Sequence, residues 1–211
     1  MTTDIQRKAS DFHWFRRLWH FLGVMAMAAL YWPRSQPQAL ILALWISAVL
    51  VGMDLLRLFI PPLNKQLTFL FRPFLRTCEV HRLTAASSML VGVTLIVALF
   101  PKNVVLLSLL MLGIADPIAA VFGIRFGKDR LIGSKTLQGS IAAFLVCTLI
   151  CLGYFSYFHL FNDRLLLASL LGGCIGAVAE LVPVFKCDDN LTFPIISSTL
   201  IYGMFYLFGA L

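Results

Sequence analysis

Asp116 is a single carboxylate inside a long apolar stretch, and a segment rich in glycine and basic residues, which we predict to be a loop, follows it. A carboxylate at the centre of a bilayer costs about 2.5–3.5 kcal/mol, so an acid there needs a partner or a function. The following segment interleaves cations with glycines: Arg125, Lys128, Arg130 and Lys135 with Gly123, Gly127, Gly133 and Gly139. A carboxylate that can hold a metal, beside N–H groups and cations that can hold phosphate, indicates nucleotide chemistry at a membrane surface.

The segment from Gly127 to Thr136 is close to the P-loop pattern G-x-x-x-x-G-K-[ST] but does not match it. Ser134 separates Gly133 from Lys135, and no strand pattern precedes the segment, so we exclude a P-loop fold. The glycine N–H groups, the Lys135-Thr136 pair and the other cations could still surround a triphosphate.

Glu79 and Glu180 are the two glutamates of the chain. Glu180 follows Gly173 and Gly176 on one face of an apolar helix, and it lies about as far from the outer end of its helix as Asp116 does. Close packing of small residues explains the glycines but not the acids, so we expect Asp116 and Glu180 to face one another at a functional site.

Glu79 and His81 end a basic, phenylalanine-bearing segment, Lys65–Arg82, for which we predict an amphipathic helix lying on the inner leaflet. For His81 alone, an ordinary interfacial histidine is an equally good interpretation. Glu79 is therefore the stronger candidate of the two.

Asp188, Asp189 and Asn190 are three adjacent polar residues directly before an apolar run. They could simply cap a helix. Two carboxylates and an amide beside Glu180 also suit Mg²⁺, which prefers hard oxygen ligands together with phosphate, and we favour this second interpretation.

These residues are embedded in a strongly apolar chain of 211 residues, 60% hydrophobic and 13% charged, with a mean hydropathy of +0.88. Soluble domains carry about 25% charged residues, so the composition predicts an all-α, polytopic integral membrane protein. Apolar runs bounded by proline, asparagine, aspartate and basic residues predict about seven transmembrane helices. These are Leu18–Trp32, Gln38–Ile60, Leu83–Phe100, Asn103–Gly123, Gln138–Leu160, Leu165–Phe185 and Leu191–Leu211. We divide the chain into a polar N-terminus, 1–17, and one membrane-embedded catalytic domain, 18–211.

The basic residues orient this arrangement. Of the 17 Lys and Arg residues, only Arg34, Lys102 and Arg164 fall on one side of the predicted bilayer. The positive-inside rule therefore predicts a cytosolic N-terminus.

The polar clusters also fall on the cytosolic side, which favours an enzyme with a water-soluble substrate over a transporter, because a transporter needs polar groups within reach of both faces. The net charge of +7 fits anionic headgroups or nucleotide phosphate, and no motif indicates binding to nucleic acid.

Several motifs follow one another along the chain: Asp116-x-x-Ala119-Ala120-x-x-Gly123-x-Arg125-x-Gly127-Lys128, then Lys135-Thr136-Leu137-x-Gly139-Ser140, then Glu180, then Asp188-Asp189-Asn190-x-Thr192-x-Pro194. Together they resemble the CTP-dependent lipid kinases, a family of diacylglycerol, dolichol and phytol kinases. Upstream, Arg16-Arg17-x-x-His20, Asp54-Leu55-x-Arg57 and Glu79-x-His81 are similar to the fungal CTP-dependent diacylglycerol kinase in particular.

The resemblance implies transfer of the γ-phosphate of CTP to the hydroxyl of a membrane lipid, with Mg²⁺ or another divalent cation as cofactor. It assigns catalysis to Asp116, Glu180 and Glu79, and metal binding to Asp116, Asp188 and Asp189. It assigns nucleotide binding to Gly123, Arg125, Gly127, Lys128, Lys135, Thr136 and Asn190. Supporting roles fall to His20, Asp54, Arg57 and His81. Glu180 or Glu79 would orient or deprotonate the lipid hydroxyl.

Diacylglycerol is the lipid that these motifs favour, and polyprenol, dolichol and phytol remain alternatives. A phosphatidate cytidylyltransferase-like enzyme is the next alternative, and a lipid or ion transporter is the last. We expect a multi-pass protein whose active site faces the cytosol, in a bacterial inner membrane or the endoplasmic reticulum. The oligomeric state stays open, a homo-oligomer included.

Overall fold

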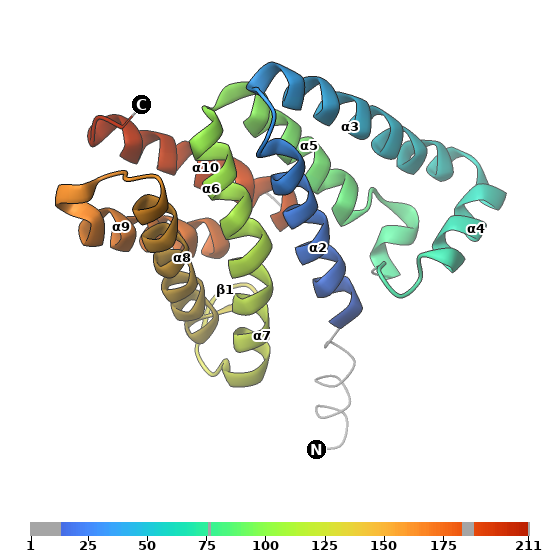
Figure 1. The fold of residues 1–211 in the computed structure, drawn as a ribbon. Helices are drawn as coiled ribbons and strands as arrows, with labels where there is room; N and C mark the ends of the chain where they lie inside the picture. Colours follow the sequence, from blue (N-terminus) through green and yellow to red (C-terminus); the bar gives the residue numbers. More distant parts are fainter. Residues whose placement is uncertain (1–13, 76, 183–187, 211) are drawn as a thin grey trace.

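Helices make up nearly all of the structure, a computed structural model that describes residues 14–75, 77–182 and 188–210 (Figure 1). The helices are α2 (Trp14–Tyr31), α3 (Gln36–Phe59), α4 (Pro61–Leu70), α5 (Ala85–Leu99), α6 (Lys102–Leu110), α7 (Asp116–Phe126), α8 (Leu137–Tyr157), α9 (Leu165–Leu181) and α10 (Asp189–Leu207). Short 3₁₀ segments are η1 (Thr77–His81) and η3 (Asn162–Arg164), and a π-helical turn, η2 (Met111–Ala115), joins α6 to α7. The strands β1 (Arg130–Ile132) and β2 (Lys135–Thr136) form one antiparallel hairpin.

The predicted helix class is confirmed, and four helices in the described part of the chain are long and apolar enough to cross a membrane. They are Gln36–Phe59, Lys102–Phe126, Leu137–Tyr157 and Asn162–Leu181. Ala85–Leu99 is apolar but shorter. These helices fit an integral membrane protein, and the full count of seven spans stays a prediction.

Two local predictions were wrong. The segment Lys65–Arg82 is not one amphipathic helix, because α4 ends at Leu70 and η1 begins only at Thr77. Pro73 explains the break: it lacks an N–H group, and it disfavours helical dihedrals at the residue before it. The glycine-rich segment after α7 is not an open loop but the β1–β2 hairpin, whose turn contains Gly133 at φ +58°. Glycine tolerates this left-handed conformation at little cost.

The polar N-terminal segment predicted for 1–17 is helical from Trp14 onward, because α2 begins there. Residues 1–13 lie outside the described residues, as do residues 183–187, into which the predicted sixth span ran. Arg16 and Arg17 are therefore part of the first turns of α2 rather than of a linker.

The helix that runs through α6, η2 and α7 is the centre of the fold (Figure 1). Val104, Leu107 and Met111 on this helix are fully buried. In Figure 1, α3 and α4 lie on one side of it and α8 and α9 on the other. The face of α3 that carries Trp45 and Phe59 stays exposed, as expected of a surface that meets lipid.

Glycines in α9 allow α8 to approach it closely. A Cβ atom at Gly172 would overlap the sulfur of Cys151, and one at Gly176 would overlap the sulfur of Cys147. The small-residue stripe therefore packs the two helices together, and Glu180 lies at the end of that stripe, one turn after Gly176.

Candidate functional site

A cavity of about 600 Å³ lies where the ends of several helices meet. Its walls are formed by the start of α2, the end of α3, the segment from α4 to the start of α5, the start of α7, β2 and the start of α10. Its polar wall consists of Arg16, Arg17, His20, Asp54, Arg57, Thr68, Glu79, Thr84, Ser87, Asp116, Lys135, Asp189 and Asn190. Its apolar wall includes Trp19, Leu50, Met53, Leu67, Phe71, Phe74, Leu75, Met89 and Leu90. The cavity thus joins a strongly polar surface to an apolar one.

Lys135 is the central cation of the polar wall. Its Nζ atom lies 3.0 Å from Glu180 Oε1 and 3.0 Å from Asp189 Oδ2. Burial disfavours the charged ammonium, but the negative charges of Asp116, Glu180 and Asp189 outweigh that penalty and raise the pKa of Lys135. Lys135 is therefore a cation held in a fixed position beside three carboxylates.

Glu180 lies behind Lys135 rather than on the cavity wall. Its side chain is 5% exposed, and Ser140 Oγ donates a hydrogen bond of 3.2 Å to Glu180 Oε2. The expectation that Asp116 and Glu180 share one site agrees with this arrangement, because both carboxylates act on the same lysine. Glu180 is placed to hold Lys135, whereas Glu79 is the glutamate that faces the cavity.

Asp116 lies directly after the π-helical turn η2. A π-turn pairs a carbonyl with the N–H group five residues later, and for Leu112 that residue is Pro117, which has no N–H. His20 Nε2 lies 3.3 Å from the Leu112 carbonyl oxygen and 3.8 Å from Asp116 Oδ2. The irregular turn therefore aims Asp116 into the cavity beside a histidine from α2.

Arg16 and Arg17 line the cavity, whereas the sequence indicated only that they orient the chain in the membrane and belong to a motif. Arg17 interacts electrostatically with Asp116. The signal for this role was the spacing Arg16-Arg17-x-x-His20, since residues three and four apart share one face of a helix.

The predicted nucleotide-binding residues divide into three groups. Lys135 and Asn190 line the cavity. Arg125 and Lys128 are both exposed, and neither lines the cavity. The Arg125 guanidinium lies over the Phe126 ring at 5.6 Å. These two cations could therefore act on a nucleotide only from outside the cavity.

The third group, Gly123, Gly127 and Thr136, makes close contacts within the protein. Thr136 caps α8 by accepting a hydrogen bond of 3.2 Å from the Gly139 N–H group. A Cβ atom at Gly127 would overlap the carbonyl oxygen of Gly123, and Thr136 Oγ1 would lie 3.0 Å from it. These contacts attach the hairpin to α7 and α8 and so place Lys135 at the cavity.

Asp188 caps the start of α10, which is the first of the two interpretations of this acidic segment. Its Oδ1 accepts hydrogen bonds from the N–H group of Asn190 at 2.9 Å and from Asn190 Nδ2 at 2.6 Å. No group of three His, Cys, Asp or Glu side chains in the described ranges is arranged to hold a metal by itself. Asp116 and Asp189 line the same cavity and both act on Lys135. Two hard carboxylates near a phosphate-binding cation fit a Mg²⁺ ion that shares its ligands with a nucleotide.

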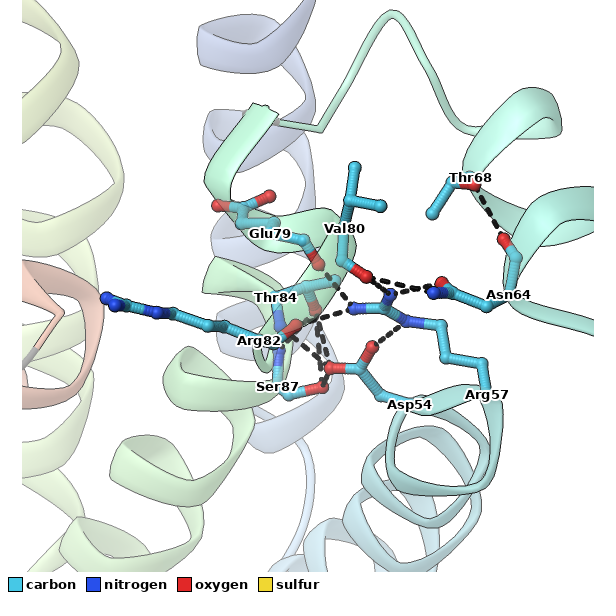
Figure 2. Close-up of polar contacts among 9 residues, drawn as sticks. All are labelled: Asp54, Arg57, Asn64, Thr68, Glu79, Val80, Arg82, Thr84 and Ser87. Carbon is cyan, nitrogen blue, oxygen red and sulfur yellow. Dashed lines mark hydrogen bonds and ion pairs between the residues drawn. The ribbon is translucent and has the colours of Figure 1, made fainter. Parts of the chain in front are cut away.

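Asp54 and Arg57 form a buried ion pair of 2.5 Å at the end of α3 (Figure 2). The guanidinium donates hydrogen bonds to backbone carbonyls of the turn that carries Glu79. His81, in the same turn, is exposed and does not line the cavity.

Comparison with known proteins gives several relatives, among them two fungal proteins and a bacterial one. The chain is 29% identical to CTP-dependent diacylglycerol kinase 1 of Schizosaccharomyces pombe, over 71% of the chain and 73% of that protein. It is 30% identical to CTP-dependent diacylglycerol kinase 1 of Saccharomyces cerevisiae, over 71% of the chain and 58% of that longer protein. It is 31% identical to an uncharacterised protein of Rickettsia prowazekii, over 88% of the chain and 91% of that protein. No family model matches the sequence, and no solved structure matches it.

Proposed function

Because the chain belongs to the family of the CTP-dependent diacylglycerol kinases, we propose that it transfers the γ-phosphate of CTP to the hydroxyl of diacylglycerol, which forms phosphatidate. The observation that carries this proposal is the single cavity with two kinds of wall. A lipid alcohol needs an apolar surface for its chains and a polar one for its hydroxyl, and a triphosphate needs cations beside that hydroxyl.

The cations of the polar wall neutralise the phosphates. Lys135 is suited to this role because it stays protonated. Arg16 and Arg17, on α2, add two further positive charges to the cavity wall. Bound Mg²⁺, held by Asp116 and Asp189 together with phosphate oxygens, would offset the charge that develops on the leaving diphosphate. Glu180 contributes by holding Lys135 in place.

Glu79 accepts the proton of the lipid hydroxyl. The hydroxyl oxygen forms a bond to the γ-phosphorus, the bond from that phosphorus to the β–γ bridging oxygen breaks, and CDP leaves. Glu79 suits this role because it lines the cavity and is 4% exposed. A base that is shielded from water accepts the proton of the lipid hydroxyl rather than that of a water molecule, so hydrolysis of the nucleotide does not compete.

The proposal includes a membrane topology of seven spans with a cytosolic N-terminus, in a bacterial inner membrane or the endoplasmic reticulum. The cavity supports it, since the start of α2, the end of α3 and the start of α5 meet there, as they do when consecutive helices alternate in direction. The site would then open toward cytosolic CTP and the inner leaflet.

Purified protein in liposomes, given each labelled nucleoside triphosphate and a panel of diacylglycerol, polyprenol and phytol, tests this function. We expect CDP and phosphatidate from CTP and diacylglycerol. Release of pyrophosphate would instead indicate a cytidylyltransferase, and phosphorylation of polyprenol or phytol alone would overturn the choice of lipid.

The variant Asp116→Asn tests the site. We expect a loss of activity of at least about 100-fold with an unchanged unfolding temperature, because the amide keeps the shape of the side chain but removes its charge. Asp163→Asn, at an exposed position in η3, is the matched control. Wild-type activity in Asp116→Asn would show that Asp116 has no part in the reaction.

A further inference from the structure

Arg57 joins the end of α3 to three backbone carbonyls of one short turn (Figure 2). We propose that Arg57 is a positioning residue, which fixes the turn from Glu79 to Arg82 and thereby sets the place of the Glu79 carboxylate in the cavity. The proposal rests on the proposed function, in which Glu79 meets the lipid hydroxyl.

The guanidinium of Arg57 uses both of its outer nitrogens on this turn. Nη2 donates to the carbonyl oxygens of Glu79 at 2.9 Å and Arg82 at 2.7 Å. Nη1 donates to the Val80 carbonyl oxygen at 3.4 Å and to Asn64 Oδ1 at 2.8 Å. Asn64 Nδ2 in turn donates to the Val80 carbonyl oxygen at 3.0 Å, so α4 holds the same turn from a second direction.

Asp54 completes the arrangement from the other side of the guanidinium. Its Oδ1 accepts from Arg57 Nε at 2.5 Å, while its Oδ2 accepts from the Thr84 N–H group at 2.8 Å and from Ser87 Oγ at 2.5 Å. Arg57 therefore holds residues 79–82, and Asp54 holds the first turn of α5, so the pair fixes both ends of the segment that follows Glu79.

Glu79 is oriented by its backbone in this network. Figure 2 shows the Glu79 carbonyl directed toward Arg57 and the Glu79 carboxylate directed away from it. Since Glu79 lines the cavity and is 4% exposed, a small rotation of the turn would move the carboxylate relative to a bound hydroxyl. Arg57 thus acts on the reaction through geometry rather than through its charge.

Stability alone is a weak reason for such a pair. Arg57 is 3% exposed and Asp54 is 7% exposed, and removing two charges from water costs about as much as their attraction returns. The planar guanidinium supplies five N–H donors in a fixed fork, which lysine cannot reproduce. An arginine at position 57 can therefore hold several backbone carbonyls in fixed positions at once.

Hydrogen–deuterium exchange of the full chain in detergent micelles tests the positioning directly. Arg57→Lys keeps a positive charge opposite Asp54 but cannot reach all three carbonyls. We expect faster exchange at the amides of residues 79–84, and no change there in Arg34→Lys, the same substitution at the far end of the fold, where Arg34 donates to the Leu30 carbonyl. Unchanged exchange at 79–84 in Arg57→Lys would overturn the proposal, whether or not the protein is a kinase.

A double-mutant cycle with Glu79→Gln tests the link to the reaction. We expect Arg57→Lys to lower kcat by about 100-fold, with the KM for CTP within about 2-fold of wild type. In the Glu79→Gln background, Arg57→Lys should have almost no further effect on kcat. Equal losses in both backgrounds would show that Arg57 acts independently of Glu79, which contradicts the proposal. Absence of CTP-dependent lipid phosphorylation in the wild type would instead refute the proposed function and leave the exchange result to decide the positioning.

Discussion

Lys135 and Glu180 form an ion pair of 3.0 Å that joins the β-hairpin to the last turn of α9. A second ion pair of 3.0 Å, to Asp189, extends the contact to the start of α10. One lysine therefore connects the hairpin to the end of α9 and to the start of α10, at the wall of the cavity.

Replacing Lys135 with methionine should lower both stability and activity. Glu180 would remain as a buried charge without its cation, which costs about 3–5 kcal/mol of unfolding free energy. The double variant Lys135→Met/Glu180→Gln should recover most of that stability but no activity, as followed by thermal unfolding and by phosphatidate formation. Lys65→Met, at an exposed position on α4 that does not line the cavity, is the control. Recovered activity in the double variant would show that Lys135 does not bind phosphate.

The raised pKa of Lys135 predicts how its contribution changes with pH. A lysine in the unfolded chain has a pKa of about 10.4, so the ion pairs stabilise the fold fully below that pH and are lost as the pH rises through the higher pKa of the folded state. The difference in unfolding temperature between wild type and Lys135→Met should therefore stay constant from about pH 7 to about pH 9 and shrink only above about pH 10.4. A decrease already near pH 8 would contradict a raised pKa.

Filling the apolar part of the cavity should weaken the binding of the lipid more than the binding of the nucleotide. Ala86 lines the cavity on α5, and the variant Ala86→Phe would occupy space there. We expect the KM for diacylglycerol to rise about 10-fold or more while CTP binding is unchanged. Val91→Phe, on the exposed face of the same helix, should leave both parameters unchanged. A rise in the KM for CTP alone would mean that this part of the cavity holds the nucleotide.

Gly127 and Gly133 should respond differently to alanine. At Gly127 a Cβ atom would overlap the backbone carbonyl of Gly123 and lie 2.7 Å from Thr136 Cγ2, so we expect a loss of about 3 kcal/mol and a displaced hairpin. At Gly133 nothing lies near the new atom, and the φ of +58° costs only about 1 kcal/mol. Chemical denaturation measures both, and equal losses would show that the hairpin does not pack as described.

The sequence allowed the helices to be predicted because long apolar runs are interrupted by proline and polar residues. It also predicted that Asp116 and Glu180 belong to one site, since buried charges are rare in apolar helices and need partners. Lys135 was added to that site by the basic, glycine-rich segment and by the resemblance to the lipid kinases. The hairpin and the break at Pro73 were missed because glycine-rich and aromatic segments allow several backbone conformations.

The apolar wall of the cavity could not be predicted. Leu50 and Met53 line the cavity, while Trp45 on the same helix lies on an exposed apolar face, and side chains of this kind look alike in an apolar sequence. The position of Arg125 and Lys128 outside the cavity was also not predictable, because charge alone does not show on which side of the end of α7 these side chains lie.

The π-helical turn before Asp116 determines the face of the helix on which this carboxylate lies. Such a turn contains one residue more than an α-helix needs. Closure of this turn into a regular α-helix with every residue retained would rotate everything after it by about 100°. Asp116 would then leave the cavity although every side chain of the site was still present. Deletion of a single residue between Met111 and Ala115 would instead restore a regular helix and leave Asp116 in place, so this turn should tolerate such a deletion far better than the regular helices α6 and α7.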